Sequence, residues 1–138
     1  MRAILIAAAF CLAGAGAIAA TPEEPVAPAQ DLAFDAPQWR ALVEGKTLYY
    51  RNRNGEFVGR EYYAPGSQRA VFIYFDGSCY DGTWREDDGV FEFRYDGVFY
   101  FRHLRRGGEL IAAEVDGPEQ VVFKITNEVL SCSDDLIS

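Results

Sequence analysis

The chain has 138 residues and carries 13 Lys and Arg against 21 Asp and Glu, which gives a net charge of -8 at pH 7. This length suits one domain, and the negative charge argues against nucleic acid or an anionic lipid surface as a partner. Because the sequence contains a single histidine, a metal site built on several imidazoles is excluded, and we expect neither a metal nor another cofactor.

The first twenty residues are typical of a secretory signal peptide. Arg2 precedes an apolar stretch that ends in Ala17-Ile18-Ala19, the small-x-small pattern that signal peptidase prefers. We predict residues 1–20 to be a signal peptide, with cleavage near Ala19 or Ala20. The mature protein is then expected to be secreted or periplasmic, without a stable membrane anchor, because no later apolar segment is long enough to span a bilayer.

The residues after the predicted cleavage site are rich in Pro, Ala and Glu. The stretch TPEEPVAPAQ has no periodic apolar pattern, and such a segment buries too little apolar surface to offset the entropy of ordering it. We therefore predict a disordered lead-in over residues 21–32. A single β domain is expected to occupy residues 33–138.

A short helix is predicted at the start of this domain. Asp35 is a typical helix-start residue, Pro37 lies in the first turn, and Gly45 marks the end. The helix has an apolar stripe that includes Trp39. We expect Trp39 to cover one end of a barrel or sheet rather than to contact a ligand.

Turn signals containing glycine recur after Lys46 at spacings of about 8–12 residues, which marks short antiparallel strands. Connections this short leave no room for the crossover helices of a parallel sheet. The fold class is therefore predicted as all-β: an antiparallel meander of about eight strands, forming a small up-and-down barrel or a curved two-layer sheet, preceded by one short helix. The expected strands are 47–51, 57–63, 70–75, 79–85, 90–95, 98–103, 110–115 and 121–126.

The sequence DGVFEFRYDGVFYFRH contains nearly the same eight residues twice and predicts a hairpin. A three-residue loop that ends at Gly97, with glycine at positive φ in a bulge, places Phe93 opposite Phe99. Phe91 then lies opposite Phe101, so that four rings share one face, whereas a two-residue turn divides them between both faces. We expect these rings to fill the core. An exposed aromatic platform for a ligand is the alternative.

Catalytic side chains are not evident in the sequence. His103 shares the parity of Phe99 and Phe101, which favours a structural histidine over a general base, since a base needs a nucleophile or carboxylate beside it. Most carboxylates stand next to glycine, where aspartate stabilises turns. We predict that the protein is not an enzyme and name no catalytic residue.

Two cysteines, Cys79 and Cys132, remain after removal of the predicted signal peptide, which contains the third. Thiols in an oxidising compartment pair readily, so we predict a Cys79–Cys132 disulfide. The bridge is expected to hold the C-terminal tail against the domain.

The outer face of the predicted hairpin is the candidate interaction patch. Tyr and Arg are enriched where proteins bind one another, and both occur on this face. A mixed, solvated sheet surface is the alternative interpretation. The patch consists of Glu92, Arg94, Tyr100 and Arg102.

Residues 75–84, FDGSCYDGTW, and residues 88–95, DGVFEFRY, together resemble a pattern of small secreted bacterial all-β proteins of unknown function. That pattern is Gly-x-Trp, a turn, and then a Cys-Phe-x-Tyr strand. Where it has a cysteine in the strand, this chain has Phe91 or Glu92, so no disulfide arrangement carries over from it. The resemblance implies a secreted β protein and no particular activity.

These observations favour a non-catalytic module that binds an unknown protein partner or acts as an inhibitor. Two alternatives remain: a lipocalin-like carrier of a small apolar ligand, and a structural protein of the cell envelope. We expect the number of Phe and Tyr rings to be enough to fill a barrel of short strands. An apolar pocket of several hundred Å³ would instead favour the carrier.

Overall fold

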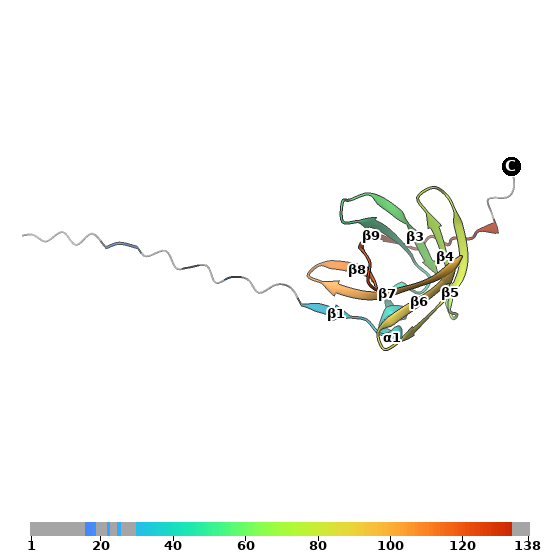
Figure 1. Cartoon of the computed structure of the whole chain (residues 1–138), viewed down its shortest axis with the longest axis horizontal. Coiled ribbons are helices and arrows are strands. Elements are labelled where there is room, and N and C mark those ends of the chain that lie inside the picture. The colour runs from blue at the N-terminus through green and yellow to red at the C-terminus, as the bar shows by residue number, and fades with distance from the viewer. Residues whose placement is uncertain (1–15, 19–21, 23–24, 26–29, 134–138) are drawn as a thin grey trace, which may run out of the picture.

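Nine strands and one helix make up the part of the chain that the computed structural model describes, residues 16–18, 22, 25 and 30–133 (Figure 1). The predicted cleavage site at Ala19 or Ala20 and most of the predicted signal peptide lie outside these residues. The elements in chain order are β1 (Asp31–Ala33), α1 (Ala36–Val43), β2 (Thr47–Asn52), β3 (Phe57–Tyr63), β4 (Arg69–Tyr74), β5 (Cys79–Asp87), β6 (Val90–Tyr95), β7 (Gly97–Arg106), β8 (Glu109–Glu114) and β9 (Glu119–Thr126).

The strands β2 to β9 form a closed barrel. Each pairs in antiparallel fashion with the next strand along the chain, and β2 also pairs with β9, which joins the two edges of the sheet. Closure pairs the backbone N–H and C=O groups that the edge strands of an open sheet would leave without partners. The predicted all-β meander is therefore confirmed, and of the two predicted arrangements the protein adopts the barrel.

The central hairpin has the predicted register. Phe93 lies opposite Phe99, and Phe91 lies opposite Phe101. Gly97 has a φ of +126°, a positive value that side chains rarely adopt, so this glycine is needed where the chain turns from β6 into β7. The strand β7 continues past its predicted end at residue 103, because β8 pairs with its second half.

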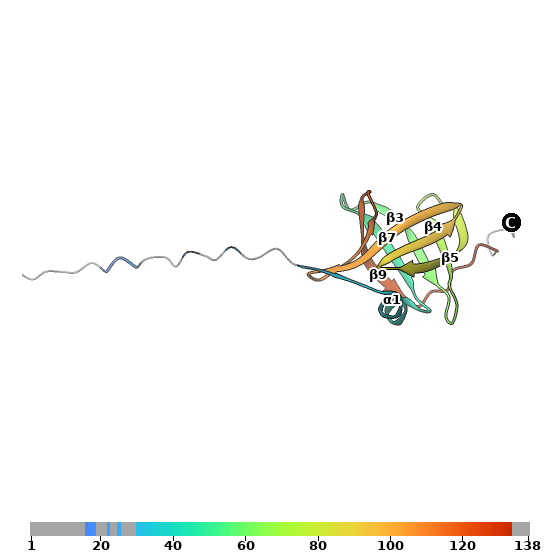
Figure 2. The ribbon, with the colours of Figure 1, turned by 60° about the horizontal axis from the view of Figure 1, so that its bottom comes forward.

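The helix α1 lies across one end of the barrel (Figure 2). It begins with a capping box, in which the Asp35 carboxylate accepts a hydrogen bond from the Gln38 backbone N–H at 2.9 Å and the Gln38 side chain accepts one from Asp35. Trp39 is fully buried and covers the barrel end, as the sequence predicted. No helix in the described residues is long and apolar enough to cross a membrane.

The strand β1 was not predicted. Asp31 and Leu32 fall within the predicted disordered lead-in, yet together with Ala33 they pair with the second half of β7. Because β6 pairs with β7 only as far as Phe101, the remainder of that edge is open to β1. The Arg106 guanidinium reinforces the pairing by donating to the Asp31 carboxylate at 2.6 Å.

The predicted disulfide between Cys79 and Cys132 is confirmed. It links the start of β5 to the segment that follows β9, with a Cα–Cα distance of 5.5 Å. Beside it, Leu130 is buried in a small apolar cluster with Tyr62 and Val71. The bridge and this cluster together hold the tail against the outside of the barrel. A loop of this length contributes on the order of 4 kcal/mol in the chain-entropy account.

Candidate functional site

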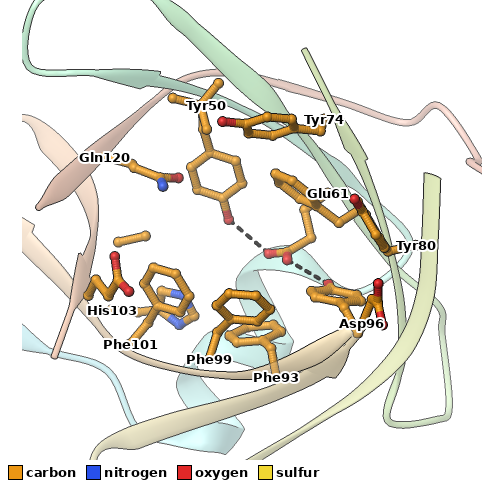
Figure 3. Close-up of a pocket in the computed structure, with 15 residues that line it drawn as sticks. Tyr50, Glu61, Tyr74, Tyr80, Phe93, Asp96, Phe99, Phe101, His103 and Gln120 are labelled. Atoms are coloured by element: carbon orange, nitrogen blue, oxygen red, sulfur yellow. Dashed lines mark hydrogen bonds between the residues drawn. The ribbon is translucent and has the colours of Figure 1, made fainter. Parts of the chain in front are cut away.

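A cavity of about 350 Å³ lies inside the barrel. Its lining side chains come from the interior and from the strand ends beside the β4–β5, β6–β7 and β8–β9 turns, such as Tyr74, Asp96 and Glu114. These turns are at the end of the barrel opposite Trp39. Neighbouring strands alternate in direction, and Trp39 contacts Tyr63 at the end of β3 and Phe91 at the start of β6. The barrel is therefore sealed at the Trp39 end and hollow toward the other, and Figure 3 shows side chains that line the hollow part.

This cavity corrects the expectation that aromatic rings fill the barrel. Two inward positions are glycines with a ring pressed against them: a Cβ on Gly59 would lie 2.7 Å from Cζ of Phe72, and one on Gly82 would lie 2.7 Å from Cδ1 of Tyr95. Both rings line the cavity. Since they lie against the backbone of neighbouring strands instead of crossing the barrel axis, the centre stays open.

His103 lies in the wall nearest the sealed end. Its ring is 1% exposed and stacks on Trp39, with ring centroids 3.8 Å apart. Burial lowers the pKa of His103 to about 3, so the imidazole is neutral at physiological pH. The predicted structural role agrees with this burial, but Nδ1 has no hydrogen-bond partner among the described residues.

A buried carboxylate, that of Glu61 on β3, also lines the cavity. Three tyrosine hydroxyls donate to it: Tyr50 to Oε1 at 3.1 Å, Tyr63 to Oε1 at 2.5 Å and Tyr95 to Oε2 at 2.6 Å. Figure 3 shows the Glu61 carboxylate beside the Tyr50 hydroxyl at the cavity wall. Strands β2, β3 and β6 thus contribute to one polar cluster in a largely apolar interior.

The ionisation of this cluster is shifted by its surroundings. Burial raises the pKa of Glu61, and the hydrogen bonds from the tyrosines oppose that shift. Burial and the neighbouring carboxylate raise the pKa of Tyr50, Tyr63 and Tyr95, which keeps all three hydroxyls protonated. The tyrosines are therefore permanent donors toward Glu61.

Sequence reasoning missed Glu61, although a signal for it exists. Glu61 has the same parity as Gly59 and Tyr63 in β3, and both of these residues are buried. A charged residue at an inward position of a strand indicates a polar cluster. Its partners Tyr50 and Tyr95 could not be assigned in the same way, because they come from strands that only the closed barrel brings together.

The cavity has an acidic character. Asp96 and Glu114 add carboxylates to that of Glu61 among its lining residues. No lysine or arginine lines it within the described part of the chain. The described lining is thus mostly aromatic, with acidic groups and without a positively charged side chain.

The candidate interaction patch lies elsewhere, on the outside of β6 and β7. Glu92 pairs with Tyr100 across the two strands and is only 8% exposed, because Arg85 and Arg94 form ion pairs with it at 2.8 and 2.5 Å. Tyr100 is 46% exposed. Arg102 follows on the same face of β7 and is exposed as well. The structure places these residues on one surface, and their binding role stays a prediction.

No family model matches the chain, and neither the curated proteins nor the solved structures contain a match to it. Among the described residues, no group of three or more His, Cys, Asp and Glu side chains is placed to hold a metal ion. Nothing in these findings points to catalysis. The resemblance to small secreted bacterial β-proteins stays a prediction, and the cavity becomes the basis for a functional proposal.

Proposed function

We propose that the protein binds a small organic molecule inside its barrel, as a lipocalin-like carrier or reservoir. The cavity of about 350 Å³ is the observation that supports this proposal. Cavities that hold small molecules measure about 300–1,000 Å³, are mostly apolar and contain a few polar groups that orient the ligand. A largely aromatic wall with a buried polar cluster around Glu61 fits that description.

The cavity wall offers apolar contacts from several strands. Phe93 and Phe101 stand with ring centroids 5.9 Å apart, in an edge-to-face arrangement, and both line the cavity. Phe99 lines it too and is 41% exposed, so its ring borders open space. A bound apolar group would cover these faces, and each CH₂ removed from water contributes about 0.8 kcal/mol.

The cavity is supported by a packed end. Trp39 contacts Tyr63 and Phe91 with ring centroids 6.0 and 6.1 Å apart, so the barrel does not depend on a ligand to fix its sealed end. A largely preformed cavity limits the ordering cost of binding. The packed end therefore favours binding without a large rearrangement of the strands.

Ligand-observed NMR and calorimetry with small aromatic molecules test this proposal. Ala112 lines the cavity, whereas its neighbour Ala113 has the opposite parity on β8. We expect binding to the wild-type protein, a reduction of at least about tenfold in Ala112→Leu, and wild-type affinity in the matched variant Ala113→Leu. An absence of binding by every aromatic probe, or equal affinities in both variants, would contradict an internal site.

A second candidate function is binding of a protein partner through the outer patch. Val98 and Tyr100 are 45% and 46% exposed on β7, and charged residues surround them. Aromatic residues flanked by arginine are typical of the centre of protein interfaces. In affinity capture from the native compartment, Tyr100→Ala is expected to lose the partner while Ala112→Leu retains it. Retention of the same partner by Tyr100→Ala would exclude this patch.

A further inference from the structure

The Glu61 carboxylate has an acceptor position that the tyrosines do not use. An ionised carboxylate offers about four lone-pair positions, two on each oxygen. Tyr50 and Tyr63 both donate to Oε1, whereas Tyr95 alone donates to Oε2. Because Glu61 also lines the cavity, Oε2 can accept one more hydrogen bond from a bound molecule.

Among the described residues that line the cavity, none carries a positive charge that could pair with Glu61. They include no lysine or arginine, and His103 is buried and neutral. The other carboxylates among the described lining residues are those of Asp96 and Glu114. A buried negative charge without a cation nearby is costly, so a positively charged guest gains from this field and a negatively charged one is repelled.

The rings beside Glu61 are also suited to a cation. Phe93 and Tyr95 have centroids 5.9 Å apart, and Phe72 lies 6.0 Å from Tyr95. All three rings line the cavity. The faces of aromatic rings carry partial negative charge and attract ammonium groups, most strongly where water is excluded. Carboxylate and rings therefore favour the same kind of guest.

We propose that the cavity selects a small organic cation, an amine with an aromatic or branched aliphatic body, and that an N–H of its ammonium group donates to Oε2 of Glu61 while the rings contact the rest. This inference rests on the proposed internal binding site and adds the chemical class of its ligand. Neutral and anionic apolar molecules of the same size are the weaker ligands.

Three probes of nearly the same shape test the charge preference on the wild-type protein by calorimetry at pH 7: 2-phenylethylamine, 2-phenylethanol and 3-phenylpropionate. The amine is expected to bind at least about tenfold more tightly than the alcohol, and the acid least tightly. Equal affinity for the amine and the alcohol would overturn the cation inference and leave the internal site intact. Failure of all three to bind would overturn the internal site itself.

Glu61→Gln identifies the residue responsible. Glutamine retains the shape and one acceptor for the tyrosines but removes the charge, so the preference for the amine should fall to within about twofold of the alcohol. Glu128→Gln is the matched control, because the Glu128 carboxylate accepts a hydrogen bond from the Tyr49 hydroxyl on the outside of the barrel. It should retain the wild-type preference. An unchanged preference in folded Glu61→Gln would overturn the role of Glu61.

Tyr95→Phe covers the case in which Glu61→Gln does not fold. It removes the hydroxyl that donates to Oε2 and leaves the carboxylate and the ring in place. The variant should bind the amine at least as tightly as the wild-type protein, because Oε2 then has a further acceptor position available. A loss of amine binding of about tenfold in the folded variant would contradict direct contact between the ammonium group and Oε2.

Discussion

The two ends of the barrel are built from the same strands and differ in what covers them. At the sealed end, Phe91 of β6 is fully buried under Trp39 and beside His103. At the hollow end, Phe99 of β7 faces the same interior but is 41% exposed. An inward aromatic residue is therefore part of a core only where another element covers it, and elsewhere it becomes the wall of a cavity.

His103 and Glu61, two buried polar residues of the barrel interior, also differ in their surroundings. His103 at the sealed end is neutral because burial disfavours its charged form. Glu61 borders the cavity and is surrounded by three tyrosine donors. Burial has thus removed the charge of the histidine, whereas Glu61 presents its carboxyl group, with its tyrosine donors, to the cavity.

The largest effect is expected for the residue that seals the barrel. Trp39→Ala should lower the free energy of unfolding by about 3–5 kcal/mol, because it removes the largest fully buried side chain and leaves a void. Tyr74→Ala at the hollow end, where the side chain is 39% exposed, should cost far less. Urea unfolding measures both. Equal losses would mean that the two ends contribute alike to stability.

A second pair compares rings within one hairpin. Phe91→Ala should cost about 3–4 kcal/mol, and Phe99→Ala about 1 kcal/mol or less, because only the first ring is enclosed on all sides. Phe99→Ala is expected to change ligand affinity instead. Chemical unfolding together with calorimetry separates the two effects. A larger loss of stability for Phe99 would invert the assignment of core and cavity.

His103 makes the sealed end sensitive to acid. Its pKa is about 3 in the folded protein and 6.5 when unperturbed, so between these values the unfolded chain binds more protons and stability falls as pH falls. From pH 7 to pH 4 this contributes a loss of about 3 kcal/mol. His103→Leu lacks the titrating group and should lose less stability over the same range. Parallel pH profiles in urea unfolding would contradict this origin.

The smallest expected effect concerns two turn glycines at opposite ends. Gly97 has a φ of +126°, while a Cβ there would meet the Phe99 ring only at 3.6 Å, an ordinary contact. Gly97→Ala should therefore cost about 1 kcal/mol through the backbone alone. Gly108 has no positive φ and open space around it, so Gly108→Ala should be nearly neutral. Thermal unfolding compares them, and equal melting temperatures would contradict the strained turn.

Local pattern by itself determined the eight strands of the barrel, the helix and the central register. Alternation at period two defined β6 and the start of β7, and the loop ending at Gly97 set their pairing. The capping residues around Asp35 defined the start of α1. These features were predictable because they depend on residues close together in the sequence, whose spacing and turn chemistry fix the backbone directly.

The tertiary structure alone decided the cavity and its carboxylate. Tyr50, Glu61 and Tyr95 come from β2, β3 and β6, and β6 is separated from β3 by β4 and β5 in the sheet. Periodicity assigns such residues to the inside, but it does not say which of them meet across a closed barrel. Nor does it reveal that rings lie against Gly59 and Gly82 and leave the centre open. Those outcomes depend on barrel closure and packing between distant strands, which only the folded chain brings together.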